Sequence, residues 1–141
     1  MDKQMPEYGS FPRIGTKPIL LVEDHESNIF VISLYIERLG YEYEVARNGK
    51  EAFEKFKSKK YSVILMDVEM PDLNGIDATK LIRAYEVEEK LVPTSIIGIT
   101  AHALSVHRER CLDAGMSDYV SKPVNLDLLK VKLEHFIRLT N

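Results

Sequence analysis

The sequence predicts an α/β domain with a doubly wound parallel sheet that helices cover on both faces. Apolar runs of four to six residues alternate with segments that carry apolar residues at helical spacing, and short turns join them. The runs are continuously apolar, which is typical of strands buried on both faces. Five such strands alternating with five helices indicate a (βα)5 three-layer sandwich.

The strands and helices are expected in strict alternation. The runs expected as strands are residues 19–22, 41–46, 62–66, 95–100 and 118–121. Ser27 or Asn28 can cap the first helix and Gly40 ends it, while Asn48-Gly49 turns the chain into the second. The fourth and fifth helices are expected over residues 104–114 and 126–139, with Gly115 as the stop of the fourth.

The third helix is expected to follow the turn at Asn74-Gly75. Its apolar stripe consists of Ala78, Leu81, Ile82 and Tyr85. The residues that follow, Glu86 to Lys90, are mostly charged and are expected as the exposed end of this helix.

Size and composition restrict the class of protein. The chain has 141 residues, of which 45% are hydrophobic, enough for one globular domain. A net charge of -3 without a basic run argues against nucleic-acid binding. No apolar segment is long enough for membrane insertion, and the single cysteine, Cys111, suits a reducing compartment, so a cytoplasmic location is expected. Residues 1–17 are interpreted as a leader or linker remnant and residues 18–141 as the domain.

Polar side chains follow four of the expected strands. Glu23 and Asp24 come after the first strand, Asp67 after the third, Thr100 ends the fourth and Lys122 follows the fifth. Parallel strands place their carboxyl ends at one edge, where doubly wound folds bind ligands. Asp67 alone would be an ordinary turn residue, and its interpretation depends on these partners.

The residue types at this edge favour phosphoryl chemistry. Three carboxylates without a basic residue in the same turns repel one another, and a hard divalent cation, most plausibly Mg²⁺, is their natural counterion. Lys122 and Thr100 add a positive charge and a hydroxyl donor for a phosphoryl group. Asp67 is then the candidate nucleophile, because carboxylates form aspartyl phosphates.

These motifs resemble the receiver domain of two-component response regulators. The resemblance rests on Val-Glu23-Asp24, Met66-Asp67-Val-Glu-Met-Pro71, Ile99-Thr100-Ala101 and Tyr119-Val-Ser-Lys122-Pro123. Residues 101–104 and 108–115 are especially similar to receivers of hybrid histidine kinases. The resemblance implies a flavodoxin-like fold with strand order 2-1-3-4-5, and it allows a cis Lys122–Pro123 peptide.

The resemblance also implies roles for individual residues. Asp67 accepts the phosphoryl group. Asp24 and Asp67 bind Mg²⁺, for which Mn²⁺ can substitute, with the backbone carbonyl of Glu69, while Glu23 acts through bound water. Thr100 and Lys122 are catalytic, and the backbone of Ala101 contacts the phosphate. Thr100 and Tyr119 are the switch pair.

The implied partners are a histidine kinase or histidine phosphotransfer protein, and a downstream partner of unknown identity. The downstream partner would bind the face made by the fourth helix, fifth strand and fifth helix. The chain is then a phosphoacceptor that catalyses only its own phosphorylation and dephosphorylation. It can be free-standing, a phosphorelay intermediate, or part of a hybrid kinase, in which case a membrane can tether it.

Several alternatives stay open. Glu69 and His102, two positions beyond Asp67 and Thr100, either tune the lifetime of the phosphate or are solvated and inert. An aspartyl-phosphate-forming phosphohydrolase shares a nucleophilic Asp at a strand end, although Glu69 stands where such enzymes have a second Asp. A receiver-like interaction module that is never phosphorylated is the third reading. The four histidines show no zinc-site spacing.

Overall fold

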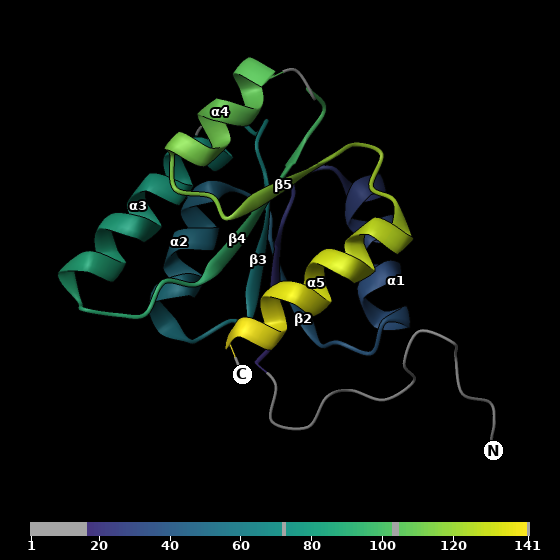
Figure 1. Cartoon of the computed structure of the whole chain (residues 1–141), viewed down its shortest axis with the longest axis horizontal. Helices are drawn as coiled ribbons and strands as arrows, with labels where there is room; N and C mark the ends of the chain where they lie inside the picture. The colour runs from purple at the N-terminus through teal and green to yellow at the C-terminus, as the bar shows by residue number, and fades with distance from the viewer. Residues whose placement is uncertain (1–16, 72, 103–104, 141) are drawn as a thin grey trace.

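The computed structural model describes residues 17–71, 73–102 and 105–140. The expected leader therefore lies outside the described residues, except for Lys17. The strands are β1 (Ile19–Val22), β2 (Tyr43–Ala46), β3 (Val63–Asp67), β4 (Ser95–Thr100) and β5 (Asp118–Ser121), and the helices are α1 (Glu26–Arg38), α2 (Gly49–Ser58), α3 (Gly75–Glu88), α4 (Ser105–Asp113) and α5 (Leu126–Thr140). All strands pair in parallel in the order β2-β1-β3-β4-β5, so the predicted flavodoxin-like fold is confirmed (Figure 1).

Helices cover both faces of the sheet and explain why the strands are continuously apolar. On one face, Leu20, Ile64 and Met66 pack against α2, α3 and α4. On the other face, Leu21 and Leu65 pack against α1 and α5 (Figure 1). Each central strand thus contributes alternate side chains to two cores, and a polar residue inside any of them would be buried without water.

A glycine brings α3 close to the end of β3. A Cβ atom added to Gly75 would collide with the backbone oxygen of Asp67. The Gly75 N–H donates to the Val68 carbonyl oxygen at 3.2 Å, and the Asn74 side chain caps α3 by accepting from the Asp77 N–H at 2.9 Å. The loop after Asp67 is therefore held between β3 and the start of α3.

The expected helix stops are found, but the expected cap of α1 was wrong. Gly40 and Gly115 have positive φ angles of 90° and 110°, the region that glycine adopts without strain. The N-cap of α1 is His25, with no side-chain capping bond, instead of Ser27 or Asn28. Asn28 points its amide at Glu23 instead, donating to Oε2 at 3.4 Å.

The prediction that Glu86 to Lys90 form an exposed end of α3 was also wrong for Glu86. The Glu86 side chain is buried and accepts from the Arg83 guanidinium and the Thr94 backbone N–H, both at 2.7 Å. Arg83 in turn donates to the Gly115 carbonyl oxygen at 2.9 Å. Leu81 departs from the predicted stripe as well, since it is 40% exposed while Ile82 is buried.

Within residues 17–71, 73–102 and 105–140, no helix combines the length and the apolar character needed to cross a bilayer.

Candidate functional site

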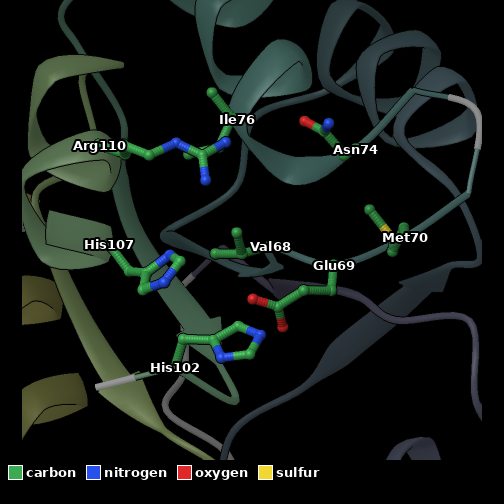
Figure 2. Close-up of a pocket in the computed structure, with 8 residues that line it drawn as sticks. All are labelled: Val68, Glu69, Met70, Asn74, Ile76, His102, His107 and Arg110. Carbon is green, nitrogen blue, oxygen red and sulfur yellow. The ribbon is translucent and has the colours of Figure 1, made fainter. Parts of the chain in front are cut away.

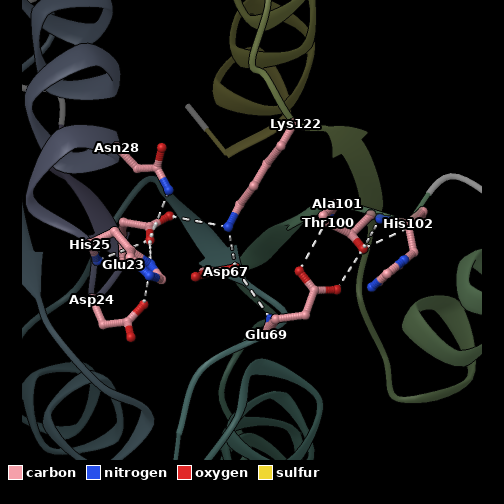
Figure 3. A network of polar contacts seen from close by, with 10 residues as sticks. All are labelled: Glu23, Asp24, His25, Asn28, Asp67, Glu69, Thr100, Ala101, His102 and Lys122. Carbon is pink, nitrogen blue, oxygen red and sulfur yellow. Dashed lines mark hydrogen bonds and ion pairs between the residues drawn. The ribbon is translucent and has the colours of Figure 1, made fainter.

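The carboxyl ends of β1, β3, β4 and β5 bring the predicted side chains together at one edge of the sheet (Figure 3). Asp67 lies at the centre, fully buried. Its Oδ1 atom is 3.0 Å from Lys122 Nζ, which is also 3.8 Å from Glu23 Oε1. Lys122 therefore reaches across the sheet to two acids that the chain places 99 and 55 residues away. The Lys122–Pro123 peptide is cis.

Burial dominates the ionisation of Asp67. It raises the pKa of this carboxyl to about 7; the hydrogen bond from Lys122 opposes the rise, and the negative charge of Glu23 adds to it. Burial lowers the pKa of the Lys122 ammonium, but the hydrogen bond and charge of Asp67 outweigh burial and leave this pKa raised. One ammonium is therefore too little positive charge for the buried acids around it.

The acidic side of the site has carboxylate oxygens to spare. Glu23, Asp24, His25 and Asp67 each offer a ligand atom, and these atoms lie within 4.8 Å of one another. Glu23 Oε1, Asp24 Oδ1 and Asp67 Oδ2 are buried and accept no hydrogen bond. Oxygen ligands of this kind suit a hard divalent cation, so the residues present fit Mg²⁺.

The other side of the site is fully hydrogen-bonded. The Thr100 hydroxyl donates to Glu69 Oε2 at 2.8 Å, and the Ala101 N–H donates to Glu69 Oε1 at 3.2 Å (Figure 3). The Glu69 N–H donates to Asp67 Oδ1 at 3.2 Å. The half-buried Glu69 side chain is thus hydrogen-bonded to the end of β4, whereas the His102 side chain is exposed, and the roles of both residues stay predictions.

A cavity of about 250 Å³ lies beside Glu69. Its wall includes His102, which lies next to Glu69, and His107 and Arg110, which lie on the α4 side of the cavity (Figure 2). The His102 and His107 rings stack with centroids 4.8 Å apart. The cavity therefore connects the edge of the sheet with α4.

Tyr119, the second predicted switch residue, lies on β5 and is half-buried. The Arg108 guanidinium of α4 lies 5.8 Å from the centre of its ring. Tyr119 therefore stands between β5 and α4, away from the acids around Asp67. Its movement stays a prediction.

Sequence reasoning missed three contributors to the site. His25 lies 3.2 Å from Asp24 Oδ1, and its position directly after the acid pair was the available signal. Asn28 reaches Glu23 from the first turn of α1. Arg110 lies within the 108–115 motif, but nothing in that motif indicated that its side chain lines a cavity beside Glu69.

Comparison with known proteins places these features in a family. The family model of the response regulator receiver domain matches residues 19–134. A probable histidine kinase 1 of Oryza sativa subsp. indica is 35% identical over 89% of this chain, and the aerobic respiration control sensor protein ArcB of Escherichia coli is 36% identical over 84%. This chain covers only 16% and 15% of those two proteins.

Solved structures agree with the sequence comparison. A complex of the Saccharomyces cerevisiae histidine phosphotransfer signaling protein Ypd1 with the receiver domain of Ssk1 matches with a TM-score of 0.85 and 30% identity, over 89% of this chain and 91% of the matched chain. The receiver domain of the sensor histidine kinase PA1611 from Pseudomonas aeruginosa, with a magnesium ion in its active-site cleft, matches with a TM-score of 0.78 and 39% identity, over 88% of this chain and 99% of that one. The chain belongs to the response regulator receiver domains of two-component phosphorelays.

Proposed function

We propose that this chain accepts a phosphoryl group on Asp67 from a phosphohistidine and signals by changing a partner-binding surface. One observation carries the proposal: Asp67 is buried among acids, in contact with Lys122, and keeps Oδ2 without a hydrogen bond. A carboxylate in such a place contributes nothing to stability that an apolar residue would not. Its chemistry accounts for its position.

In the transfer step, a carboxylate oxygen of Asp67 attacks the phosphorus of the phosphohistidine. The phosphorus–nitrogen bond breaks, and its electron pair returns to the imidazole of the donor, which then takes a proton from water. Lys122, 3.0 Å from Oδ1, places an ammonium next to the charge that develops on the phosphoryl oxygens. The product is an acyl phosphate on Asp67.

The acidic side is proposed as a Mg²⁺ site. Asp24, Asp67 and the backbone carbonyl of Glu69 would hold the ion directly, and Glu23 through water. When bound, Mg²⁺ offsets the negative charge shared by the carboxylates and the phosphoryl group. The magnesium ion in the cleft of the PA1611 receiver supports this assignment. Substitution by Mn²⁺ stays a prediction.

Thr100 and the Ala101 N–H are proposed as donors to the bound phosphoryl group. Thr100 and Tyr119 would then move together and reshape the surface of α4, β5 and α5, where a downstream partner binds. Glu69 and His102 would tune the lifetime of the phosphate. Hydrolysis rates of phosphorylated Glu69→Ala and His102→Ala variants test the last point, and rates equal to the parent's would contradict it.

The proposed phosphodonor is a histidine kinase or a histidine phosphotransfer protein, as the Ypd1–Ssk1 complex suggests. The chain would act as a phosphoacceptor without substrate turnover. We propose residues 18–141 as the functional domain, residues 1–17 as a leader or linker, and a cytoplasmic location in keeping with the buried thiol of Cys111. A membrane can tether the domain if it belongs to a hybrid kinase.

Intact-mass spectrometry with Mg²⁺ and phosphoramidate tests the central claim. We expect the wild-type chain to gain one phosphoryl group, and expect no gain without Mg²⁺ or in Asp67→Asn. Glu37→Gln, which removes a carboxylate at the end of α1, is the control and should behave as wild type. A gain that persists in Asp67→Asn would contradict the assignment.

The same assay separates the alternatives. A phosphohydrolase would release inorganic phosphate over many turnovers and keep no stable adduct. An interaction module that is never phosphorylated would gain no mass with any donor. One phosphoryl group per chain, lost slowly, is the outcome that the receiver function requires.

A further inference from the structure

The Glu69 carboxylate occupies the two donors at the end of β4 that the proposed function assigns to the phosphoryl group. Thr100 Oγ1 and Ala101 N each donate to a different oxygen of Glu69, at 2.8 and 3.2 Å. A carboxylate that accepts from adjacent donors through both oxygens presents two negatively charged acceptors, as a phosphoryl group also does. Glu69 therefore stands where an oxyanion is bound.

These donors cannot serve two anions at once. A threonine hydroxyl has one hydrogen to donate, and so has a backbone N–H. The Thr100 hydroxyl is buried and already accepts from the His102 N–H at 3.0 Å, which restricts the directions left to its own hydrogen. A phosphoryl group on Asp67 can bind Thr100 and Ala101 only after Glu69 has left them.

The cavity beside Glu69 can accommodate this side chain after it leaves Thr100 and Ala101. The cavity of about 250 Å³ beside it is lined on the α4 side by His107 and Arg110. The Arg110 side chain lies on the α4 side of this cavity, and Glu69 lies on the other side (Figure 2). A rotation of the Glu69 side chain would exchange two hydrogen-bond donors on β4 for a cation on α4.

We infer that Glu69 is a built-in competitor of the phosphoryl group, which holds Thr100 and Ala101 before phosphorylation and moves toward Arg110 when the phosphoryl group takes these donors. The inference rests on the proposed function for the identity of the competing anion. It makes Glu69 a positioning residue, because it acts on Asp67 chemistry through the two donors. It also gives phosphorylation a direct effect on α4, part of the proposed partner-binding face.

The test measures the affinity of the Mg²⁺-loaded chain for fluoroberyllate, a stable mimic of a phosphoryl group on a carboxylate. Glu69→Gln keeps the size of the side chain but loses its charge and one acceptor oxygen. We expect it to bind fluoroberyllate about fivefold to tenfold more tightly than wild type. Its rate of phosphorylation by phosphoramidate should rise by a similar factor, and Glu37→Gln should change neither.

The Arg110→Gln variant tests whether the displaced Glu69 carboxylate moves toward Arg110. In the wild-type background it should weaken fluoroberyllate binding about twofold to threefold, because the displaced carboxylate loses its cation. In the Glu69→Gln background, Arg110→Gln should not change fluoroberyllate binding, because the uncharged side chain at position 69 gains nothing from the Arg110 cation. The amide resonance of Ala101 provides a readout without ligand, and it should shift in Glu69→Gln and stay in place in Arg110→Gln.

The fluoroberyllate results decide the inference separately from the proposed function. Equal or undetectable binding in wild type and Glu69→Gln would overturn the competition. An Arg110→Gln effect of the same size in both backgrounds would overturn the destination. Failure of wild type to take a phosphoryl group on Asp67, with the fluoroberyllate differences intact, would count against the proposed function alone.

Discussion

The two sides of the site differ in how well their polar atoms are satisfied. On the acidic side, buried oxygens of Glu23, Asp24 and Asp67 accept no hydrogen bond. On the donor side, the Thr100 hydroxyl and Ala101 N–H are both engaged by Glu69. Buried polar groups are nearly always paired in folded proteins. The unpaired oxygens of the acidic side therefore indicate a missing partner, whereas the donor side already has one.

The difference indicates what each side lacks. The acidic side has an excess of negative charge and would be stabilised by a cation. The donor side already holds an anion and can bind another only by exchange. A cation can therefore be added to the acidic side, whereas an anion that binds on the donor side must replace the Glu69 carboxylate.

Removing the central charge should have the largest effect on stability. The folded-state pKa of Asp67 is raised to about 7, so its ionisation opposes folding: the contribution of this carboxyl to stability is most favourable below its unfolded-state pKa of about 4, falls as pH rises to about 7 and levels off above that. Asp67→Asn should match wild type near pH 4 and exceed it above pH 8 by on the order of 4 kcal/mol. Urea denaturation in EDTA across this pH range measures the difference. A constant difference at all pH values would contradict the electrostatic origin.

Adding the missing cation should stabilise the acidic side next most. At a free Mg²⁺ concentration 100 times its dissociation constant, the free energy of unfolding should rise by about 2.7 kcal/mol. Thermal denaturation of wild type with and without Mg²⁺ measures the gain. Asp24→Asn should lose most of it, and Glu37→Gln should retain it; an equal gain in Asp24→Asn would place the ion elsewhere.

Removing the Lys122 ammonium should have the third largest effect. Lys122→Gln leaves Glu23 and Asp67 buried without their ammonium, and the expected loss above pH 8 without metal is roughly 2 kcal/mol. The matched control is Lys132→Gln, because Lys132 has a similar exposure, 22% against 20%, and pairs with the more exposed Asp118. Chemical denaturation should show the larger loss for Lys122→Gln, and equal losses would refute the special role of burial.

Changing a donor should have a smaller effect on stability than on switching. Thr100→Val removes the hydroxyl that bonds Glu69 and leaves the His102 N–H without that acceptor, at an expected loss of about 1 kcal/mol. Thr100→Ser retains the hydroxyl and loses only a buried methyl group, at an expected loss of about 0.8 kcal/mol. Thermal denaturation of both variants distinguishes the hydroxyl from the methyl group, and the reverse ranking would contradict the hydrogen-bond explanation.

The smallest effect is expected at a carboxylate far from the site. Hydrogen bonds from Lys59 and then Tyr61 hold the pKa of Glu44 below its usual range. A lowered pKa stabilises the fold above the unfolded-state value and the gain disappears as pH falls through the folded-state value. Glu44→Gln should therefore cost less than about 1 kcal/mol at pH 7 and nothing near pH 3, opposite in sign to Asp67→Asn. Matched urea titrations of the two variants check this sign.

The alternation of strands and helices and the meeting of the strand ends followed from the sequence pattern, whereas the strand order was implied only by the family resemblance. Continuous apolar runs placed helices on both faces, and parallel strands then brought Asp67, Thr100 and Lys122 to one edge. The hydrogen bonds of Glu69 were not predictable, because they depend on a side-chain rotamer and on the loop after β4.

The errors share one physical cause. Glu86 was taken as solvated because its neighbours are charged, yet the Arg83 guanidinium and the Thr94 N–H satisfy it in the interior. His25 and not Asn28 is the N-cap of α1, and the Asn28 amide donates to Glu23 instead. In each case a specific side-chain hydrogen bond outweighed the preference expected from residue type and neighbouring charge.

The assembly of the site from four strand ends has a consequence for quality control. Glu23, Asp67, Thr100 and Lys122 lie far apart along the chain and meet only when β1, β3, β4 and β5 are paired in register. A misfolded or partly synthesised chain has the acceptor residue but lacks its surroundings. Competence to receive a signal is therefore coupled to completion of the fold, and a damaged copy is silent instead of active.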